Sequence, residues 1–187
     1  MKWLVLVVVA GCVDASDPSW QLAHDRVLAV AFDPPRILPG QSARVTALVA
    51  HRDAEVDEEQ PVAMTVVSPR ELYTAVHYNL DHWQVDCPMV AAPTELEIEL
   101  RLPPGEVATK TIWLGETGAN PTVTATVPDP FPRGEDVDLG AGEWFTSCGT
   151  LDGSALRVDA PCEGQVVVVV RADDGGVAWQ VLPLHAP

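Results

Sequence analysis

Residues 95–102 read Glu-Leu-Glu-Ile-Glu-Leu-Arg-Leu, so every even position is apolar and every odd position is charged. Successive side chains of a β-strand point to opposite faces, and this period of two therefore predicts a strand with one face in a core and the other in water. Prolines 103 and 104 and Gly105 end the strand, and residues 107–114 (VATKTIWL) continue in residue types that favour extended backbone. The two stretches predict a β-hairpin or two neighbouring strands.

Similar short segments, separated by proline and glycine, occur along the rest of the chain. Residues 165–172 (QVVVVVRA) are apolar without alternation, which is typical of a central strand buried on both faces. The Asp-Asp-Gly-Gly sequence at 173–176 tolerates positive φ, so we expect the chain to return as a strand over 177–182. Residues 122–127 alternate threonine with apolar residues, and other strands are expected at 27–32, 42–51, 62–67 and 142–148. The pattern predicts an all-β protein.

One segment departs from this pattern. Ser68 and Glu71 have the spacing of a capping box, and Pro69 stands at the first helical position. Apolar residues then recur near helical spacing, which predicts one short helix over 69–78. The alternative is a pair of strands, the first through Val76, Tyr78 and Leu80 and the second through Trp83, Val85 and Cys87.

Composition limits the function classes. The chain has 187 residues, of which 47% are hydrophobic and 20% charged, and this balance favours a packed core over disorder. Its 11 Lys and Arg against 27 Asp and Glu give a net charge of -16, which argues against nucleic acid and anionic lipid surfaces as partners. No apolar run approaches the roughly 18 residues that a membrane-spanning helix requires.

The first residues have the layout of an export signal. Lys2 supplies a positive charge, residues 3–10 (WLVLVVVA) are apolar, and Gly11 precedes Cys12. Residues 9–12 (VAGC) resemble the lipobox of bacterial lipoproteins, in which the peptide is cut before the cysteine and its thiol carries a diacylglycerol. The resemblance implies a signal peptide over 1–11, lipidation of Cys12, and a location at the bacterial outer membrane or cell surface. We expect residues 12–25 to form a polar tether. The alternative is a buried N-terminal strand with Cys12 as a core thiol.

The cysteines agree with export to an oxidising compartment, where disulfides persist. Cys148 and Cys162 enclose 13 residues around a stretch that contains glycine and aspartate, and we predict that they form a disulfide. Cys87 is then left unpaired, and the competing arrangement pairs Cys87 with Cys148 or Cys162. A zinc site is not expected, because the chain has no C-x-x-C or H-x-x-x-H pair.

Two parts of the chain are similar to a known kind of protein. Residues 26–40 (RVLAVAFDPPRILPG) and 45–50 (VTALVA) resemble the opening of immunoglobulin-like modules in lipoproteins of myxobacterial and related delta-proteobacterial type. Residues 143–152 (EWFTSCGTLD), 160–161 (AP) and 168–179 (VVVRADDGGVAW) resemble the closing half of such modules, which is similar to PKD domains. The resemblance covers about half of the chain and implies an immunoglobulin-like β-sandwich. We expect two tandem modules, 26–115 and 116–187, with a linker at 115–121; the alternative is one enlarged sandwich.

The residues that could perform chemistry are few. The chain has no G-x-S-x-G elbow, P-loop, G-x-G-x-x-G or H-E-x-x-H motif, so we expect no enzyme. His77 and His82, with Asp81 and Asp86, form a dense titratable patch that could act as a metal or acid–base site. On one continuous strand, however, a five-residue offset would send the two imidazoles to opposite faces.

An acidic run is the candidate cation site. Carboxylate oxygens suit Ca²⁺, but the run lacks the glycine and the spacing of an EF-hand loop, so the alternative is a solvated acidic loop. The residues are Asp53, Glu55, Asp57, Glu58 and Glu59. Three tryptophans, Trp113, Trp144 and Trp179, lie within apolar strand patterns and are expected in the core rather than on a ligand platform.

These observations predict a lipid-anchored, non-enzymatic envelope or cell-surface protein that acts as an interaction or structural module. The alternative is an adhesin-type module that binds carbohydrate or calcium, and a hydrolase is a third reading. The expected partners are a membrane, through the acyl lipid on Cys12, and an envelope protein or glycan. No cofactor besides that lipid is expected, with calcium left open, and no nucleic acid is expected.

Overall fold

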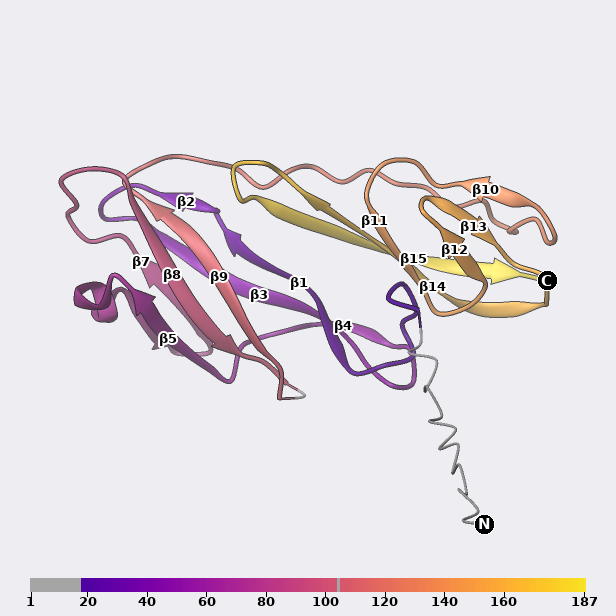
Figure 1. Cartoon of the computed structure of the whole chain (residues 1–187), viewed down its shortest axis with the longest axis horizontal. Helices are drawn as coiled ribbons and strands as arrows, with labels where there is room; N and C mark the ends of the chain where they lie inside the picture. The colour runs from indigo at the N-terminus through magenta and orange to yellow at the C-terminus, as the bar shows by residue number, and fades with distance from the viewer. Residues whose placement is uncertain (1–17, 104) are drawn as a thin grey trace, which may run out of the picture.

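The computed structural model describes residues 18–103 and 105–187. These residues form strands β1 to β15 and one short 3₁₀ helix, η1, which confirms the predicted all-β fold (Figure 1). The strands are β1 (Arg26–Asp33), β2 (Arg36–Ile37), β3 (Ser42–Ala50), β4 (Val56–Glu59), β5 (Ala63–Ser68), β6 (Val76–Asn79), β7 (His82–Asp86), β8 (Thr94–Arg101), β9 (Val107–Leu114), β10 (Asp136–Asp138), β11 (Glu143–Thr146), β12 (Thr150–Asp152), β13 (Ala155–Arg157), β14 (Cys162–Arg171) and β15 (Val177–Ala186), and η1 spans Arg70–Ala75.

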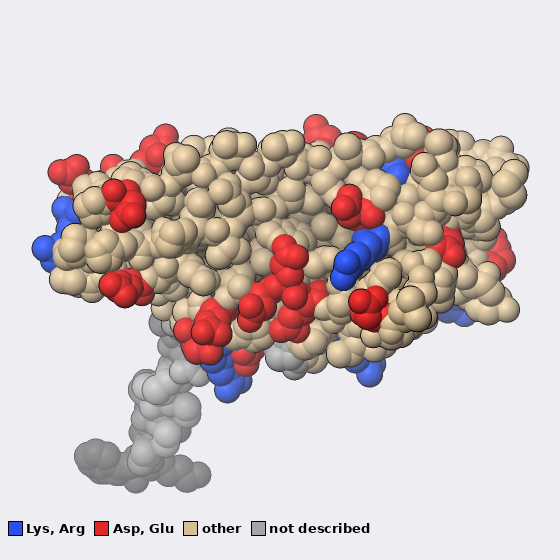
Figure 2. All heavy atoms as spheres, turned by 180° about the vertical axis from the view of Figure 1, so that it is seen from behind, with Lys and Arg blue, Asp and Glu red and all other residues tan. Residues whose placement is uncertain are grey.

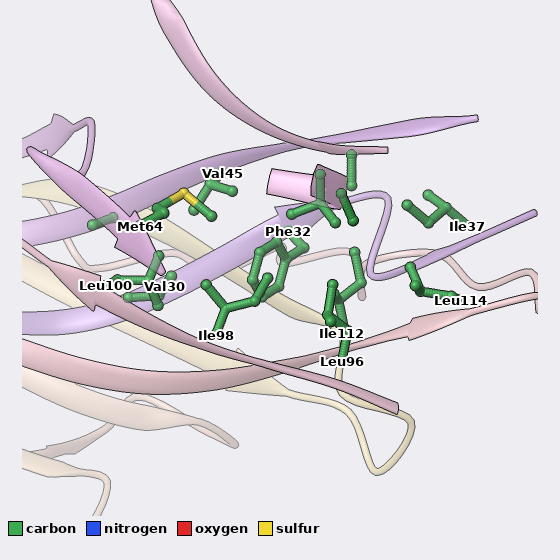
Figure 3. Packing of buried hydrophobic residues seen from close by; sticks show 14 of the residues in the cluster. Val30, Phe32, Ile37, Val45, Met64, Leu96, Ile98, Leu100, Ile112 and Leu114 are labelled. Carbon is green, nitrogen blue, oxygen red and sulfur yellow. The ribbon is translucent and has the colours of Figure 1, made fainter. Parts of the chain in front are cut away.

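The first sandwich, which holds β1 to β9, is immunoglobulin-like. One of its sheets has the strand order β1-β3-β7-β6, with β4 also paired to β3, and the other has the order β2-β9-β8-β5. The predicted alternation is confirmed in β8, where Leu96, Ile98 and Leu100 are fully buried between the sheets, followed by Leu102. Figure 3 shows how Leu96, Ile98 and Leu100 lie toward residues of the facing sheet, which include Val30, Phe32 and Val45. β8 and β9 pair antiparallel, as predicted.

The second sandwich packs the sheet β11-β14-β15 against the smaller sheet β10-β13-β12. Its core contains Phe131, Trp144, Leu156 and Leu184, all at most 4% exposed. The hairpin predicted around residues 173–176 is present, because β14 and β15 pair antiparallel from Cys162↔Ala186 to Arg171↔Val177. The second sandwich follows the first along the length of the molecule (Figure 1).

A third hydrophobic core joins the two sandwiches. Leu28, Ala29, Leu48 and Ala50 from the first sandwich pack with Phe145, Val167 and Val169 from the second. β14 is buried on both faces, as its sequence predicted, and the two faces serve different cores. Val166 and Val168 enter the second core, whereas Val167 and Val169 enter the junction, and all four are at most 1% exposed. Apolar burial of this kind opposes separation of the two sandwiches.

Polar contacts of Arg36 fasten the segment that connects the two sandwiches. The Arg36 side chain pairs with Glu116, donates to the carbonyl oxygen of Asp174 at 2.9 and 3.1 Å, and lies over the ring of Trp113 at 5.6 Å. Gly115 N also donates to Ile37 O at 2.7 Å. The segment predicted as a linker is therefore held against both sandwiches.

Residues 20–22 of the predicted tether are packed against the second sandwich, so the prediction was wrong for these residues. Leu22 is fully buried, its N–H donates to Thr146 O at 3.0 Å, and Thr146 N donates to Trp20 O at 2.9 Å. Gln21 forms an isolated parallel β-bridge with Thr146, the last residue of β11, and Leu22 is part of the third core at the junction of the two sandwiches. Cys12, the signal peptide and residues 12–17 lie outside the described residues.

Two local predictions were also corrected. The helix expected over 69–78 ends at Ala75, and the chain continues as β6 and β7, the strand pair that was its alternative. Residues 122–127 form no strand although Val123, Ala125 and Val127 face the second core. Gln180 supplies a side-chain partner there, because its Oε1 accepts from Ala125 N at 2.9 Å. Over the described residues, no helix has the length and apolar character needed to cross a membrane.

Candidate binding surface

The outer face of the β1-β3-β4 region carries the candidate site. Odd-numbered residues of β3 point into the first core, and even-numbered residues point outward. Leu48 and Ala50 are the outward residues that the second sandwich covers. Arg44 and Thr46 lie on the same face but remain uncovered, with Arg44 exposed and Thr46 half-buried. The second sandwich therefore leaves an open strip of this sheet beside the junction.

This strip is hollowed into a groove. Two adjoining hollows of about 310 and 390 Å³ share Asp33, Thr46 and Glu58. The first sandwich also contributes Ala31, Arg44 and Gln60 to the lining, and the second sandwich contributes Asn120, Val177, Ala178 and Trp179. Because both sandwiches form the walls, the groove depends on the junction between them.

Side-chain hydrogen bonds of Trp179 and Asn120 fix the walls of the groove. Trp179 Nε1 donates to Glu58 Oε1 at 2.8 Å, which ties β15 to β4. Asn120 bridges the sandwiches, because its Nδ2 donates to Phe32 O at 3.0 Å and its Oδ1 accepts from Val177 N at 3.0 Å. The walls are therefore positioned by the protein itself, which lowers the entropic cost of binding a ligand.

Other polar groups of the groove have hydrogen-bonding capacity left. The Arg44 guanidinium makes no hydrogen bond or ion pair within residues 18–103 and 105–187, and it carries five N–H donors. Gln60 Oε1 is buried without a hydrogen-bond partner among the same residues. One oxygen each of Asp33 and Glu58 is engaged, by Asn120 and Trp179, and each carboxylate keeps a second acceptor oxygen.

The histidine patch continues this surface on the β6–β7 hairpin. In the strand register, Gln84 of β7 lies opposite Arg44 of β3 on one side and opposite His77 of β6 on the other. Asn79 faces His82 in the same hairpin, so both imidazoles lie on one face of the sheet. The opposite-face arrangement described for a continuous strand does not occur, because the chain turns at Leu80 and Asp81 between the two histidines.

Hydrogen bonds within the patch connect its side chains to one another. Gln84 Nε2 lies 3.0 Å from His77 Nε2 and donates to Asp86 Oδ1 at 2.9 Å. Ser42 Oγ donates to the same Asp86 oxygen at 2.6 Å. The Ser42 hydroxyl is thus bonded to a carboxylate instead of a histidine base.

Asp81 is the residue of the patch with a shifted pKa. The hydrogen bond between its carboxylate and His82 Nδ1, at 2.7 Å, is the main cause that lowers the Asp81 pKa, and the charge of Arg44 contributes. Arg44 therefore lines the groove and also acts on Asp81 of the patch through its charge.

The acidic run is divided between two faces. It was expected in a loop, but four of its residues belong to or flank strand β4, which pairs with β3. Asp57 and Glu59 lie 3.8 and 3.0 Å from His51 Nε2, whereas Glu58 points to the opposite face and binds Trp179. Figure 2 shows acidic side chains gathered near the middle of one face of the molecule. No group of three or more His, Cys, Asp and Glu suited to a metal ion occurs among the described residues, and calcium binding stays a prediction.

The remaining predicted site residues have clear positions. The Cys148–Cys162 disulfide is present, as predicted, and Cys87 is a free, buried cysteine. Burial raises the pKa of the Cys87 thiol. Trp144 belongs to the second core, but Trp113 lies under Arg36 and Trp179 forms a wall of the groove. The groove could not be predicted from local patterns, because Glu58 and Trp179, which meet across it, are 121 residues apart in the chain.

No family model matches the chain, and no curated protein matches it. Among solved structures, the chain is similar to cadherin domains 3–6 of protocadherin gamma B2 (13% identity, 87% of this chain and 47% of that chain, TM-score 0.31). It is also similar to domains 1–5 of the same protein (16% identity, 88% and 40%, TM-score 0.29) and to titin domains Z1Z2 in complex with telethonin (14% identity, 88% and 98%, TM-score 0.25). The chain spans less than half of the two protocadherin chains. Likeness at this level assigns no function.

Proposed function

We propose that the protein is an exported, lipid-anchored, non-enzymatic binding protein whose two sandwiches act as one body. The observation that carries the binding role is the groove between them, because its walls come from both sandwiches and are fixed by Asn120 and Trp179. The junction core of Leu48, Phe145 and Val167 supports the relative position of these walls. A groove positioned in advance is suited to recognition of a ligand.

A binding role agrees with the chemistry of the surface. Nucleophilic catalysis requires a hydroxyl or thiol within hydrogen-bond reach of a base. In the histidine patch the Ser42 hydroxyl donates to Asp86, and in the first core Cys87 is only 4% exposed. Burial raises the pKa of the Cys87 thiol, which disfavours the nucleophilic thiolate. These residues are therefore suited to structural roles rather than to attack on a substrate.

The lipid anchor rests on the sequence around Cys12. The chain from Cys12 to Trp20 covers eight peptide units, which can span at most about 28 Å. Because Trp20 and Leu22 are bonded to β11, a lipid on Cys12 would hold the second sandwich close to the membrane. Each buried methylene adds about 0.8 kcal/mol of membrane affinity, so several acyl chains would make the attachment stable.

Metabolic labelling tests the anchor. Bacteria that produce the full chain are grown with a clickable palmitate analogue, and labelling of the protein is followed for the wild type, Cys12→Ser and Cys87→Ser. We expect label in the wild type and in Cys87→Ser and none in Cys12→Ser. Label that persists in Cys12→Ser would refute the proposed attachment.

A further inference from the structure

We propose that the groove between the two sandwiches binds a neutral oligosaccharide. This inference rests on the proposed binding function and names the chemical class of the ligand. It depends on three properties of the groove: unused donors and acceptors placed together, an aromatic wall, and the balance of charge.

The unused polar groups of the groove match hydroxyl groups. Arg44 offers only N–H donors, Asp33 and Glu58 offer carboxylate acceptors, and Gln60 adds to the same lining an amide whose Oε1 has no hydrogen-bond partner among the described residues. A ligand for this set must accept from the guanidinium and donate to the carboxylates. Each hydroxyl group can do both, and a sugar carries several hydroxyls on one ring. A purely cationic ligand would satisfy the carboxylates but would oppose Arg44.

The apolar part of the groove matches the C–H faces of a sugar ring. The lining includes Ala31 and Val177, and the half-buried Trp179 lies on the same face of β15 as Val177. The hydrogen bond to Glu58 holds the indole in place before a ligand arrives. Aromatic rings combine a large apolar surface with a fixed orientation, which suits stacking against a flat ligand.

Charge and size narrow the ligand further. Asp33 and Glu58 outnumber Arg44 in the groove, and the whole chain carries a net charge of -16, so phosphorylated or acidic sugars would be repelled. The two hollows, of about 310 and 390 Å³, fall within the range of small-molecule sites. A chain of a few uncharged sugar units fits this space better than a folded protein surface does.

The test uses the full chain, purified in detergent, on an array of neutral oligosaccharides of glucose, mannose, galactose and N-acetylglucosamine. Titration calorimetry then measures the affinity for each sugar that is bound. We expect binding to at least one of them, and we expect Arg44→Ala and Gln60→Ala each to weaken it about tenfold, as the loss of a charged or buried hydrogen bond does.

Arg101→Ala is the matched control for Arg44→Ala. Both arginines are exposed, each stands on a strand of the first sandwich, and Arg101 lies on the opposite sheet. Because Arg44 is exposed and unbonded, its loss should leave the thermal midpoint unchanged. The inference is overturned if no sugar on the array binds, if both groove variants bind as the wild type does, or if Arg101→Ala weakens binding equally.

The two proposals can fail separately. Labelling that depends on Cys12 together with a blank array would remove the oligosaccharide and leave the anchored protein. The oligosaccharide would also be refuted if no sugar binds and the protein captures a protein partner from envelope extracts, provided that Arg44→Ala abolishes this capture. Sugar binding in a protein without lipid would overturn the anchor and retain the groove.

Discussion

The Nε1 atom of Trp179 lies 2.8 Å from Glu58 Oε1, and this hydrogen bond joins the last strand of the second sandwich to an edge strand of the first. Trp179 also packs against the junction core, so one side chain links the packing between the sandwiches to the wall of the groove. Because of this contact, Glu58 points away from Asp57 and Glu59, its neighbours in the acidic run of the sequence.

A double-mutant cycle on this pair should detect the link. Trp179→Phe removes the donor, and Glu58→Ala removes the acceptor. Urea unfolding of the single and double variants should give a coupling energy of about 1 kcal/mol, the usual contribution of such a bond. Glu55, an exposed neighbour whose side chain makes no bond to Trp179, is the control, and Glu55→Ala should show no coupling to Trp179→Phe. Equal coupling in both cycles would contradict the assignment.

The two faces of β14 allow the junction to be weakened selectively. Val166 and Val167 are adjacent and fully buried, but the first faces the second core and the second faces the junction. Removing the two methyl groups of either valine should cost about 1–3 kcal/mol, because each leaves a cavity. Calorimetry should show one unfolding transition for the wild type. Val167→Ala should separate it into two, whereas Val166→Ala should lower the midpoint of the second sandwich. An identical effect of the two variants would mean that the junction does not couple the sandwiches.

The disulfide should stabilise the second sandwich by restricting the unfolded chain. Cys148 and Cys162 are 14 positions apart, and closing a loop of this length corresponds to about 3 kcal/mol of unfolding free energy. The double variant Cys148→Ser/Cys162→Ser should lose this amount in urea denaturation, and a reductant should lower the stability of the wild type but not of the variant. Cys87→Ser should retain sensitivity to the reductant. A wild type that is indifferent to reduction would argue against the bond.

Burial of Cys87 makes a prediction about pH. Burial raises the thiol pKa in the folded protein above its value in the unfolded chain. The unfolded chain then loses its proton first as the pH rises, so stability is lost above the pKa of the unfolded thiol. Above about pH 8 the wild type should therefore lose more unfolding free energy than Cys87→Ala does.

Reactivity provides an independent measurement on the same thiol. A disulfide reagent should modify native Cys87 only at the rate of unfolding, because the thiol is 4% exposed. Fast modification of the native protein, or the same pH dependence in Cys87→Ala, would contradict a buried, protonated thiol.

Local patterns in the sequence predicted the strands well. In β8 the alternation of charge and leucine or isoleucine placed the buried side chains correctly, and in β14 the run of valines predicted burial on both faces. Both features depend on neighbours along one strand. Which core each face of β14 enters could not be predicted, because the partners of Val167 and Val169 come from β1 and β3.

The errors arose where distant pairing decides the structure. Leu22 stands in a polar stretch that looks like a tether, yet it is buried because its N–H meets Thr146, more than a hundred residues away. His77 and His82 share a face because the chain turns at Leu80, a leucine at positive φ (54°), where glycine or asparagine would have signalled the turn. The groove escaped prediction for the same reason, since Arg44, Gln60 and Trp179 meet only through the fold.

Intact-mass analysis of the protein in the separated membrane and cytosolic fractions of a bacterium that produces the full chain tests the central proposal most directly. We expect a chain that begins at Cys12 and carries the additional mass of a diacylglycerol and acyl group. An unmodified chain that keeps residues 1–11 and is recovered from the cytosol would contradict it.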